Sequence, residues 1–185
     1  VASGERITEA SSGGTDVVAI VSDTDFTNIL TSSFDEIEQI EFASAGQTGT
    51  FTGVQFTGET IDLTETAAGT SNLILNVGSG TTATFANITA STFDNGADTI
   101  TINGAGGDEN ITGPDLASTI NGGTGDDIIV AGTQNDTIDG GTGDDRLTGG
   151  LGNDRYLFDT NDVASGERIT EASSGGTDVV AIVSD

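Results

Sequence analysis

Large apolar residues recur at every ninth position through the second half of the chain, each after a stretch rich in Gly, Asp and Thr. A nine-residue period matches neither an α-helix nor a heptad coiled coil. Apolar residues flanked by Thr and preceded by turn residues are typical of short strands. The series consists of Ile102, Ile111, Ile120, Ile129, Ile138, Leu147 and Tyr156. The pattern therefore predicts stacked rows, each a turn followed by a short strand.

Strand-like apolar runs also occur in the first half, but their spacing is irregular. They are separated by Gly, Ser, Thr and Asn, and recur roughly every 10 to 12 residues. This spacing suits the half-coils of a solenoid and also a small antiparallel sandwich. The runs are Ile37–Phe42, Phe51–Phe56, Thr60–Thr64, Leu73–Val77 and Thr84–Ile88. We expect irregular solenoid coils over 1–94, with the β-sandwich as the alternative.

A second repeat has a much longer period, because residues 1–23 recur unchanged as residues 163–185, 162 positions later. Such a duplication is typical of a tandem array in which each solenoid unit buries its end against the next. An engineered overlap is the alternative. We interpret 158–185 as the start of a further unit, and expect adjacent copies, head to tail, as partners. Lateral association between copies is a further expectation.

Charge and composition restrict the chemistry. Thirty acidic residues face four Arg, so the net charge is −26, and Lys, His and Cys are absent. This charge argues against binding nucleic acid and predicts cations as partners. Without Cys or His, disulfides and typical zinc sites are excluded, and hard cations with oxygen ligands remain. No run approaches the length of a membrane span, so no membrane insertion is expected, and an export signal is expected outside this segment.

Catalysis is not expected within this segment. His, Cys and Lys, the usual bases and nucleophiles, are missing, and the only Tyr, Tyr156, occupies a repeated apolar position. No H-E-x-x-H or G-x-S-x-G motif is present. We therefore expect that the segment is not an enzyme.

Three rows, 122–130, 140–148 and 149–157, resemble the G-G-x-G-x-D-x-U-x nonapeptide of RTX proteins, in which U is a large apolar residue. Row 131–139 departs at Ala131 and Gln134 but keeps Asp at the sixth position. The resemblance implies an all-β, right-handed parallel β-solenoid, with an RTX β-roll over 95–157. It also implies Ca²⁺ as the bound cofactor.

In the RTX family, two rows form one 18-residue coil and calcium lies between stacked turns. It takes the sixth-position Asp and backbone carbonyls from both turns. The resemblance thus pairs Asp127 with Asp145 and Asp136 with Asp154, which gives two calcium sites. The carbonyl ligands it implies come from the turns around Gly123, Gly125, Gly132, Gln134, Gly141, Gly143, Gly150 and Gly152. The alternative role for such Asp residues is to cap Gly-rich turns by Asx hydrogen bonds.

Further sites are weaker expectations because the register departs from the motif. Asp108 or Glu109 would share an ion with Asp127, and Asp115 would share one with Asp136. The shortened turn before residue 179 offers Asp178, as a cap or as a ligand, and its duplicate before residue 17 offers Asp16.

The function expected is a calcium-dependent structural repeat of an extracellular or cell-surface adhesin, fibre or surface-layer protein. The resemblance implies bacterial type I export and folding on calcium outside the cell. One alternative is the C-terminal RTX module of a secreted enzyme or toxin. Another is an ice-binding segment using Thr124 and Thr142, although Asp126 and Asp144 stand where that pattern wants Asn.

Overall fold

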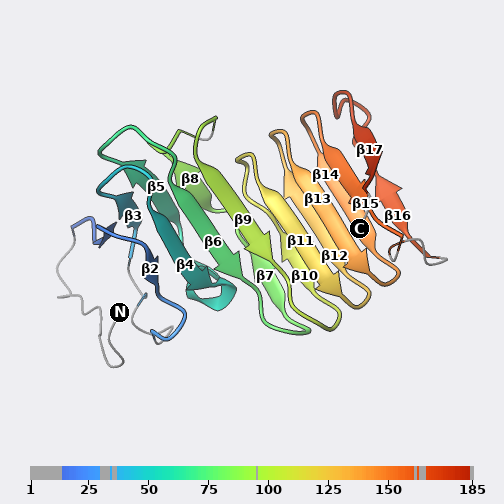
Figure 1. Cartoon of the computed structure of the whole chain (residues 1–185), viewed down its shortest axis with the longest axis horizontal. Coiled ribbons are helices and arrows are strands. Elements are labelled where there is room, and N and C mark those ends of the chain that lie inside the picture. The colour runs from blue at the N-terminus through green and yellow to red at the C-terminus, as the bar shows by residue number, and fades with distance from the viewer. Residues whose placement is uncertain are drawn as a thin grey trace.

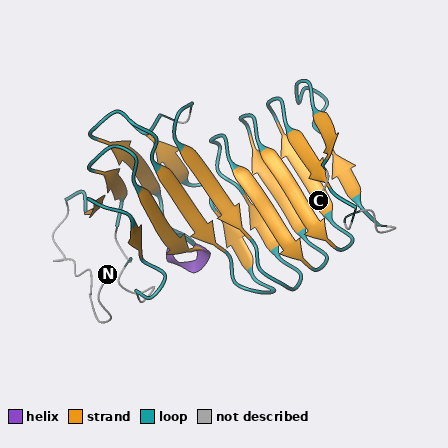
Figure 2. Cartoon of the chain, in the orientation of Figure 1, coloured by secondary structure: helices purple, strands orange, loops and turns teal. Residues whose placement is uncertain are grey.

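The computed structural model describes residues 14–29, 34, 37–94, 96–160, 162 and 166–183. These residues form an elongated stack of short strands that progresses along the long axis from the N-terminal to the C-terminal part (Figure 1). The helical structure among them is one 3₁₀ turn, η2 (Gly53–Gln55), visible below the stack in Figure 2. The described part of the chain is therefore an all-β structure.

One sheet runs the full length of the stack, in the order β17-β15-β13-β11-β9-β6-β4-β2. Its strands are β2 (Thr24–Asp25), β4 (Thr48–Thr52), β6 (Asn72–Asn76), β9 (Thr99–Asn103), β11 (Thr119–Thr124), β13 (Thr137–Thr142), β15 (Arg155–Phe158) and β17 (Val179–Ile182). All its neighbouring strands are parallel.

Two shorter parallel sheets complete the stack. The C-terminal one contains β7 (Thr82–Thr84), β10 (Asn110–Thr112), β12 (Ile128–Gly132), β14 (Arg146–Gly150) and β16 (Arg168–Thr170). The N-terminal one contains β1 (Val17–Ile20), β3 (Gln39–Phe42), β5 (Ile61–Glu65) and β8 (Ile88–Ala90). Parallel pairing of strands that are not consecutive requires the chain to coil, so the fold is a solenoid and the expected fold class is confirmed.

The nine-residue apolar series forms the core of the C-terminal half. Ile102, Ile120 and Ile138 stack in register on one sheet, whereas Ile111, Ile129 and Leu147 stack on the other. These six side chains are at most 1% exposed. Partners on successive coils here are 18 residues apart, for example Ser118 and Asp136. The alternation of strands between two sheets therefore explains why one residue in nine is apolar.

The N-terminal coils are longer. Asn72 and Thr48 are 24 residues apart on neighbouring coils, and Asn103 and Asn76 are 27 apart. The 27-residue coil contains both β7 and β8 between β6 and β9, so it contributes a strand to all three sheets. Since every described pair is parallel, these residues form solenoid coils and not the alternative antiparallel sandwich.

Three of the predicted runs match β3, β5 and β6 to within two residues, and the other two depart from the sheets. The run Phe51–Phe56 leaves the sheet after Thr52 and turns into η2, because the Gln55 side chain accepts from the Thr52 amide and donates to the Phe26 carbonyl. The run Thr84–Ile88 is not one strand but the corner between β7 and β8. Its Phe85 side chain is buried, and this aromatic burial, not strand pairing, explains the apolar character of the run.

Candidate metal centre

Asp127 and Asp145 lie on successive coils at one edge of the roll, in the turns that follow β11 and β13. The backbone amide of Asp127 donates to Oδ1 of Asp145 at 2.7 Å. The amide of Glu109, one coil earlier, donates to Oδ1 of Asp127 at 2.7 Å. Asp127 and Asp145 are fully buried. Each carboxylate is thus held by the amide of the preceding coil.

Asp136 and Asp154 repeat this arrangement at the opposite edge. The amide of Asp136 donates to Oδ1 of Asp154 at 2.9 Å. Oδ1 of Asp136 accepts from the amide and the hydroxyl of Ser118, both at 2.8 Å. The structure therefore brings together both Asp pairs that the motif implies, one pair at each edge. We call these two rows of amide-linked carboxylates the carboxylate ladders.

The second oxygen of each ladder Asp has no hydrogen-bond partner among the described residues, although it is buried. This holds for Oδ2 of Asp127, Asp136, Asp145 and Asp154. A buried acceptor without a partner is costly, and a buried unpaired charge is more costly. Turn capping uses only one oxygen of each carboxylate. It therefore does not account for the other, whereas a bound cation does.

Burial has the expected electrostatic effect on these groups. Loss of solvation raises the pKa of Asp127 to about 6 and that of Asp136 to about 7, and neighbouring carboxylates add to the rise. Burial also raises the pKa of Asp145 and of Asp154. Two carboxylates one strand spacing apart, about 4.8 Å, repel by roughly 3.5 kcal/mol at an effective dielectric constant of 20. The ladders thus favour a cation between successive coils.

The glycines of the turns allow carbonyl oxygens to reach the same edges. A Cβ on Gly125 would lie 2.2 Å from the carbonyl oxygen of Gly107, and one on Gly143 would lie 1.9 Å from that of Gly125. Both glycines have positive φ angles, +123° and +147°, which other residues rarely adopt. Each turn therefore stacks directly on the preceding turn, with its glycine backbone against a carbonyl oxygen of that turn.

The remaining carbonyl candidates lie in the same stacked turns. A Cβ built on any of the glycines among them would lie 2.1 to 2.3 Å from a carbonyl oxygen of the preceding coil. Gln134 supplies one of these oxygens, which faces Gly152. These candidates are Gly123, Gly132, Gln134, Gly141, Gly150 and Gly152. Carboxylates and carbonyls form an all-oxygen ligand set, which is what Ca²⁺ prefers. The residues present therefore fit calcium.

The additional candidate ligands differ in burial and in their hydrogen bonds. Glu109 is buried beside Asp127, but its two carboxylate oxygens accept from the amides of Gly80 and Ala105. Asp108 is exposed and accepts from the Asp126 amide, outside the ladder. Asp115 is also exposed, and Ser118 occupies the place beside Asp136.

Both ladders continue past the last nine-residue row. The amide of Asp154 donates to Oδ1 of Asp178 at 3.0 Å, and that of Asp145 donates to Oε2 of Glu167 at 3.3 Å. Oε1 of Glu167 is buried without a partner among the described residues, and burial raises the pKa of this carboxyl to about 7. Sequence reasoning missed Glu167, which follows Asp145 by 22 residues and not 18 and has no glycine-rich row before it.

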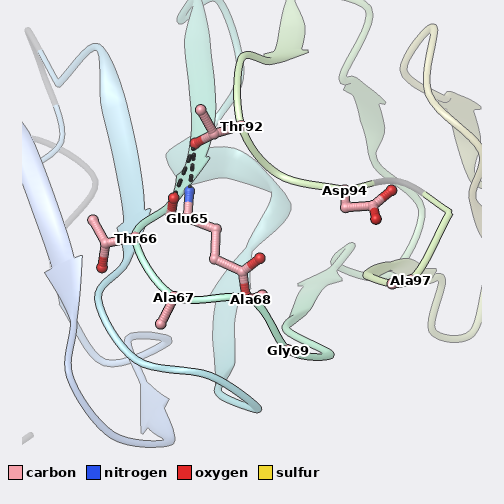
Figure 3. Close-up of a pocket in the computed structure, with 8 residues that line it drawn as sticks. All are labelled: Glu65, Thr66, Ala67, Ala68, Gly69, Thr92, Asp94 and Ala97. Atoms are coloured by element: carbon pink, nitrogen blue, oxygen red, sulfur yellow. Dashed lines mark hydrogen bonds between the residues drawn. The ribbon is translucent and has the colours of Figure 1, made fainter.

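A pocket of about 340 Å³ opens elsewhere, beside the loop that follows β5. Figure 3 shows Glu65 hydrogen-bonded to Thr92 on one side of this pocket and Asp94 on the other. The carboxylate of Glu65 accepts from the Ser71 hydroxyl. The pocket is separate from the carboxylate ladders.

Comparison with known proteins identifies the ladder-bearing rows. No curated protein and no solved structure matches the chain. The sequence model of one family, the RTX calcium-binding nonapeptide repeat, matches residues 121–156 in four copies. Those residues supply all four ladder Asp and the turns that stack around them. Residues 121–156 of this chain thus match the RTX calcium-binding nonapeptide repeat.

Proposed function

We propose that this chain is a calcium-dependent structural repeat of a secreted or cell-surface filament or adhesin stalk. The main support is the set of buried carboxylate oxygens in the two ladders that lack a hydrogen-bond partner in the part of the chain that the structure describes. Calcium between Asp127 and Asp145, and between Asp136 and Asp154, would neutralise these oxygens. The roll then folds when calcium is supplied and loosens when it is removed.

Calcium concentration would act as the switch. Extracellular calcium modules have dissociation constants of about 0.1 to 1 mM, so millimolar calcium outside a cell fills such sites and submicromolar cytosolic calcium does not. At ten times the dissociation constant, each site adds about 1.4 kcal/mol to the free energy of unfolding. Export in an unfolded state by a bacterial type I pathway, followed by folding outside, is consistent with this switch. Among the described residues, no helix is long and apolar enough to cross a membrane.

The array part of the proposal is supported by the two copies of one strand. β1 and β17 have identical sequences; β1 pairs with the later strand β3, whereas β17 pairs with the earlier strand β15. Val18 in β1 is 6% exposed, but the equivalent Val180 in β17 is 56% exposed. The same sequence thus accepts a parallel neighbour on either edge, and β17 has an apolar surface that a following coil would bury.

The ladder at this edge supports the same junction. Oδ1 of Asp178 accepts from the amide of Asp154, and the amide of Asp16, the equivalent of Asp178, donates to Glu38 at 2.8 Å. If a further unit followed, the ladder would run from Asp154 through Asp178 to the equivalent of Glu38 without a break. A repeating strand with repeating ladder bonds favours a continuous stalk over separate domains.

The proposed role is structural and not enzymatic. The hydroxyl of Tyr156, the only tyrosine, accepts from the Gly149 amide and donates to Glu171, so it is committed to the fold. The buried carboxylates of Asp127, Asp136, Asp145 and Asp154 are committed to the ladders. An RTX module of a secreted enzyme or toxin would have the same calcium chemistry. It would not need residues 1–23 to recur 162 positions later.

A chain of two units, residues 1–162 followed by 1–185, tests the array. Amide hydrogen exchange in saturating calcium is measured at the junction strand, residues 179–182 of the two-unit chain, and compared with β17 of the single unit. We expect at least tenfold slower exchange in the two-unit chain, because β3 of the second unit would cover this strand. The matched control carries Val→Asp at the position of Val180 in the junction. Equal exchange in the single-unit and two-unit chains would contradict the array.

A further inference from the structure

Three carboxylates converge at the C-terminal end of the family match, one from within it and two from the segment that follows. One oxygen each from Asp154, Glu171 and Asp178 lies within 4.8 Å of the other two. Asp154 is in the turn before β15, Glu171 directly follows β16, and Asp178 directly precedes β17. The loop between β16 and β17 therefore brings two carboxylates to the last RTX turn.

Each of these carboxylates is held by one oxygen. Oδ1 of Asp154 accepts from the Asp136 amide, and Oδ1 of Asp178 accepts from the Asp154 amide. Oε1 of Glu171 accepts from the hydroxyl of Tyr156. The bonds orient the three groups before any ion is bound.

The oxygens left over indicate a ligand independently of the clustering. Oδ2 of Asp154 and Oε2 of Glu171 are buried and have no partner among the described residues. Asp154 as a whole is 1% exposed. Hydrogen bonding within the cluster does not satisfy these atoms, so a cation is the missing partner.

The backbone of the loop lies tightly against the RTX turn. A Cβ on Gly175 would lie 3.0 Å from Oε2 of Glu171 and 3.0 Å from the carbonyl oxygen of Gly150. One on Gly176 would lie 2.0 Å from the carbonyl oxygen of Gly152. The loop thus stacks as a further turn on the last RTX row, with Glu171 and the carbonyl oxygen of Gly150 both next to Gly175.

We infer that Asp154, Glu171 and Asp178 form an additional calcium site that fastens the segment after the roll to the last RTX row. An oxygen-only set with three carboxylates suits Ca²⁺. The site differs from the sites within the roll in its third carboxylate, because Glu171 comes from a loop with no nonapeptide row. Its two outer ligands lie 17 and 24 residues after Asp154.

If the chain forms the proposed array, this site lies at the junction between two units. Glu171 and Asp178 belong to the duplicated segment and correspond to Glu9 and Asp16. Glu9 lies outside the described residues. In a tandem array, Asp154 would come from one unit and the other two ligands from the start of the next. Calcium would then clamp every junction.

The test uses the full chain and the variant Glu171→Gln/Asp178→Asn, in which the replacing amides keep the oxygens that accept from Tyr156 and Asp154. Calcium stoichiometry is measured by calorimetry, and terbium luminescence is excited through tyrosine. Tyr156 is the only tyrosine and no tryptophan is present, so sensitised emission reports ions near Tyr156. Glu59→Gln, remote in sequence from the site, is the matched control.

We expect the double variant to bind one calcium ion fewer and to lose at least half of the sensitised emission, while Glu59→Gln changes neither. The far-ultraviolet β signal in saturating calcium should stay within about a tenth of that of the unaltered chain. An unchanged stoichiometry and emission would overturn the inference. If the double variant loses its β signal, the single variant Glu171→Gln is judged by the same two readouts.

These outcomes are separable from the proposed function. If one ion is lost in the variant but chelation leaves the unaltered chain folded, the site stands and the calcium-dependent folding falls. If chelation unfolds the chain but the variant keeps every ion, the folding role stands and the additional site falls.

Discussion

The backbone amide of Asp127 donates to Oδ1 of Asp145 at 2.7 Å, while Oδ2 of Asp145 is buried without a partner among the described residues. The hydrogen bond fixes the stacking of two coils. The buried Oδ2 raises the free energy of that stacked arrangement when no cation is bound. The same pair of features recurs between Asp136 and Asp154. Coil stacking and ion binding are therefore coupled.

Neutralising one ladder pair should weaken calcium-dependent folding. In Asp127→Asn/Asp145→Asn the amide oxygens still accept the ladder hydrogen bonds, but two ligand charges are removed. We expect the calcium midpoint of folding, followed by circular dichroism, to rise at least fivefold. The control is Asp126→Asn/Asp144→Asn, which removes the same charge from adjacent exposed positions. Equal midpoints for the two double variants would show that only net charge matters.

Adding a methyl group to a stacked turn should destabilise the roll. Gly143→Ala places a Cβ against the carbonyl oxygen of Gly125 and forces alanine into a positive φ. Such a backbone conformation costs about 1–2 kcal/mol, and the clash adds to it. We expect the free energy of unfolding in calcium to fall by about 2 kcal/mol or more. Gly14→Ala, with no atom of the described residues within 4 Å of its Cβ, should change it little.

Acid should replace calcium in part. Burial raises the pKa of Asp127 to about 6 and that of Asp136 to about 7, from 3.8. The folded state therefore binds these protons more tightly than the unfolded state. Their stabilising effect is complete below about pH 4 and is lost as the pH rises through 6 to 7.

In chelator, the thermal midpoint should therefore be higher at pH 5 than at pH 8. Each pKa unit of difference corresponds to about 1.4 kcal/mol, and we expect a total of at least ~2 kcal/mol. In saturating calcium the trend should shrink or reverse, because protons then compete with the ion. A chelated protein that gains stability from pH 5 to pH 8 would contradict the ladder electrostatics.

The hydroxyl of Tyr156 should contribute to stability apart from its ring. Tyr156→Phe keeps the buried ring but removes the partner of the Gly149 amide and of Glu171. An unsatisfied buried donor costs about 1–3 kcal/mol, and we expect a loss of that size in chemical denaturation. Burial and the Glu171 carboxylate raise the pKa of Tyr156, so the effect should be independent of pH up to 10.

The sequence predicts the C-terminal half well because its period is strict. Ile120 and Ile138 stack as the nine-residue spacing requires, and the Asp residues follow from the same phase. One apolar residue and one acidic residue per row leave little freedom of register.

The remaining features arise from tertiary contacts that no period encodes. The turn at Gln55 depends on its bond to Phe26, 29 residues away. Glu167 reaches the ladder through a coil of 22 residues, and Ser118 stands where an Asp is expected and donates to Asp136. When the hydrogen-bond partner is a residue type other than the Asp of the repeat, no sequence motif marks the contact.

Circular dichroism of the full chain, recorded while calcium is removed and returned, shows whether calcium holds the stacked coils together. Chelation at pH 8 should abolish the β signal of the roll, and calcium in the 0.1 to 1 mM range should restore it cooperatively, with magnesium much less effective. A β signal that is unchanged by chelation and by calcium would show that the coils stack without the ion.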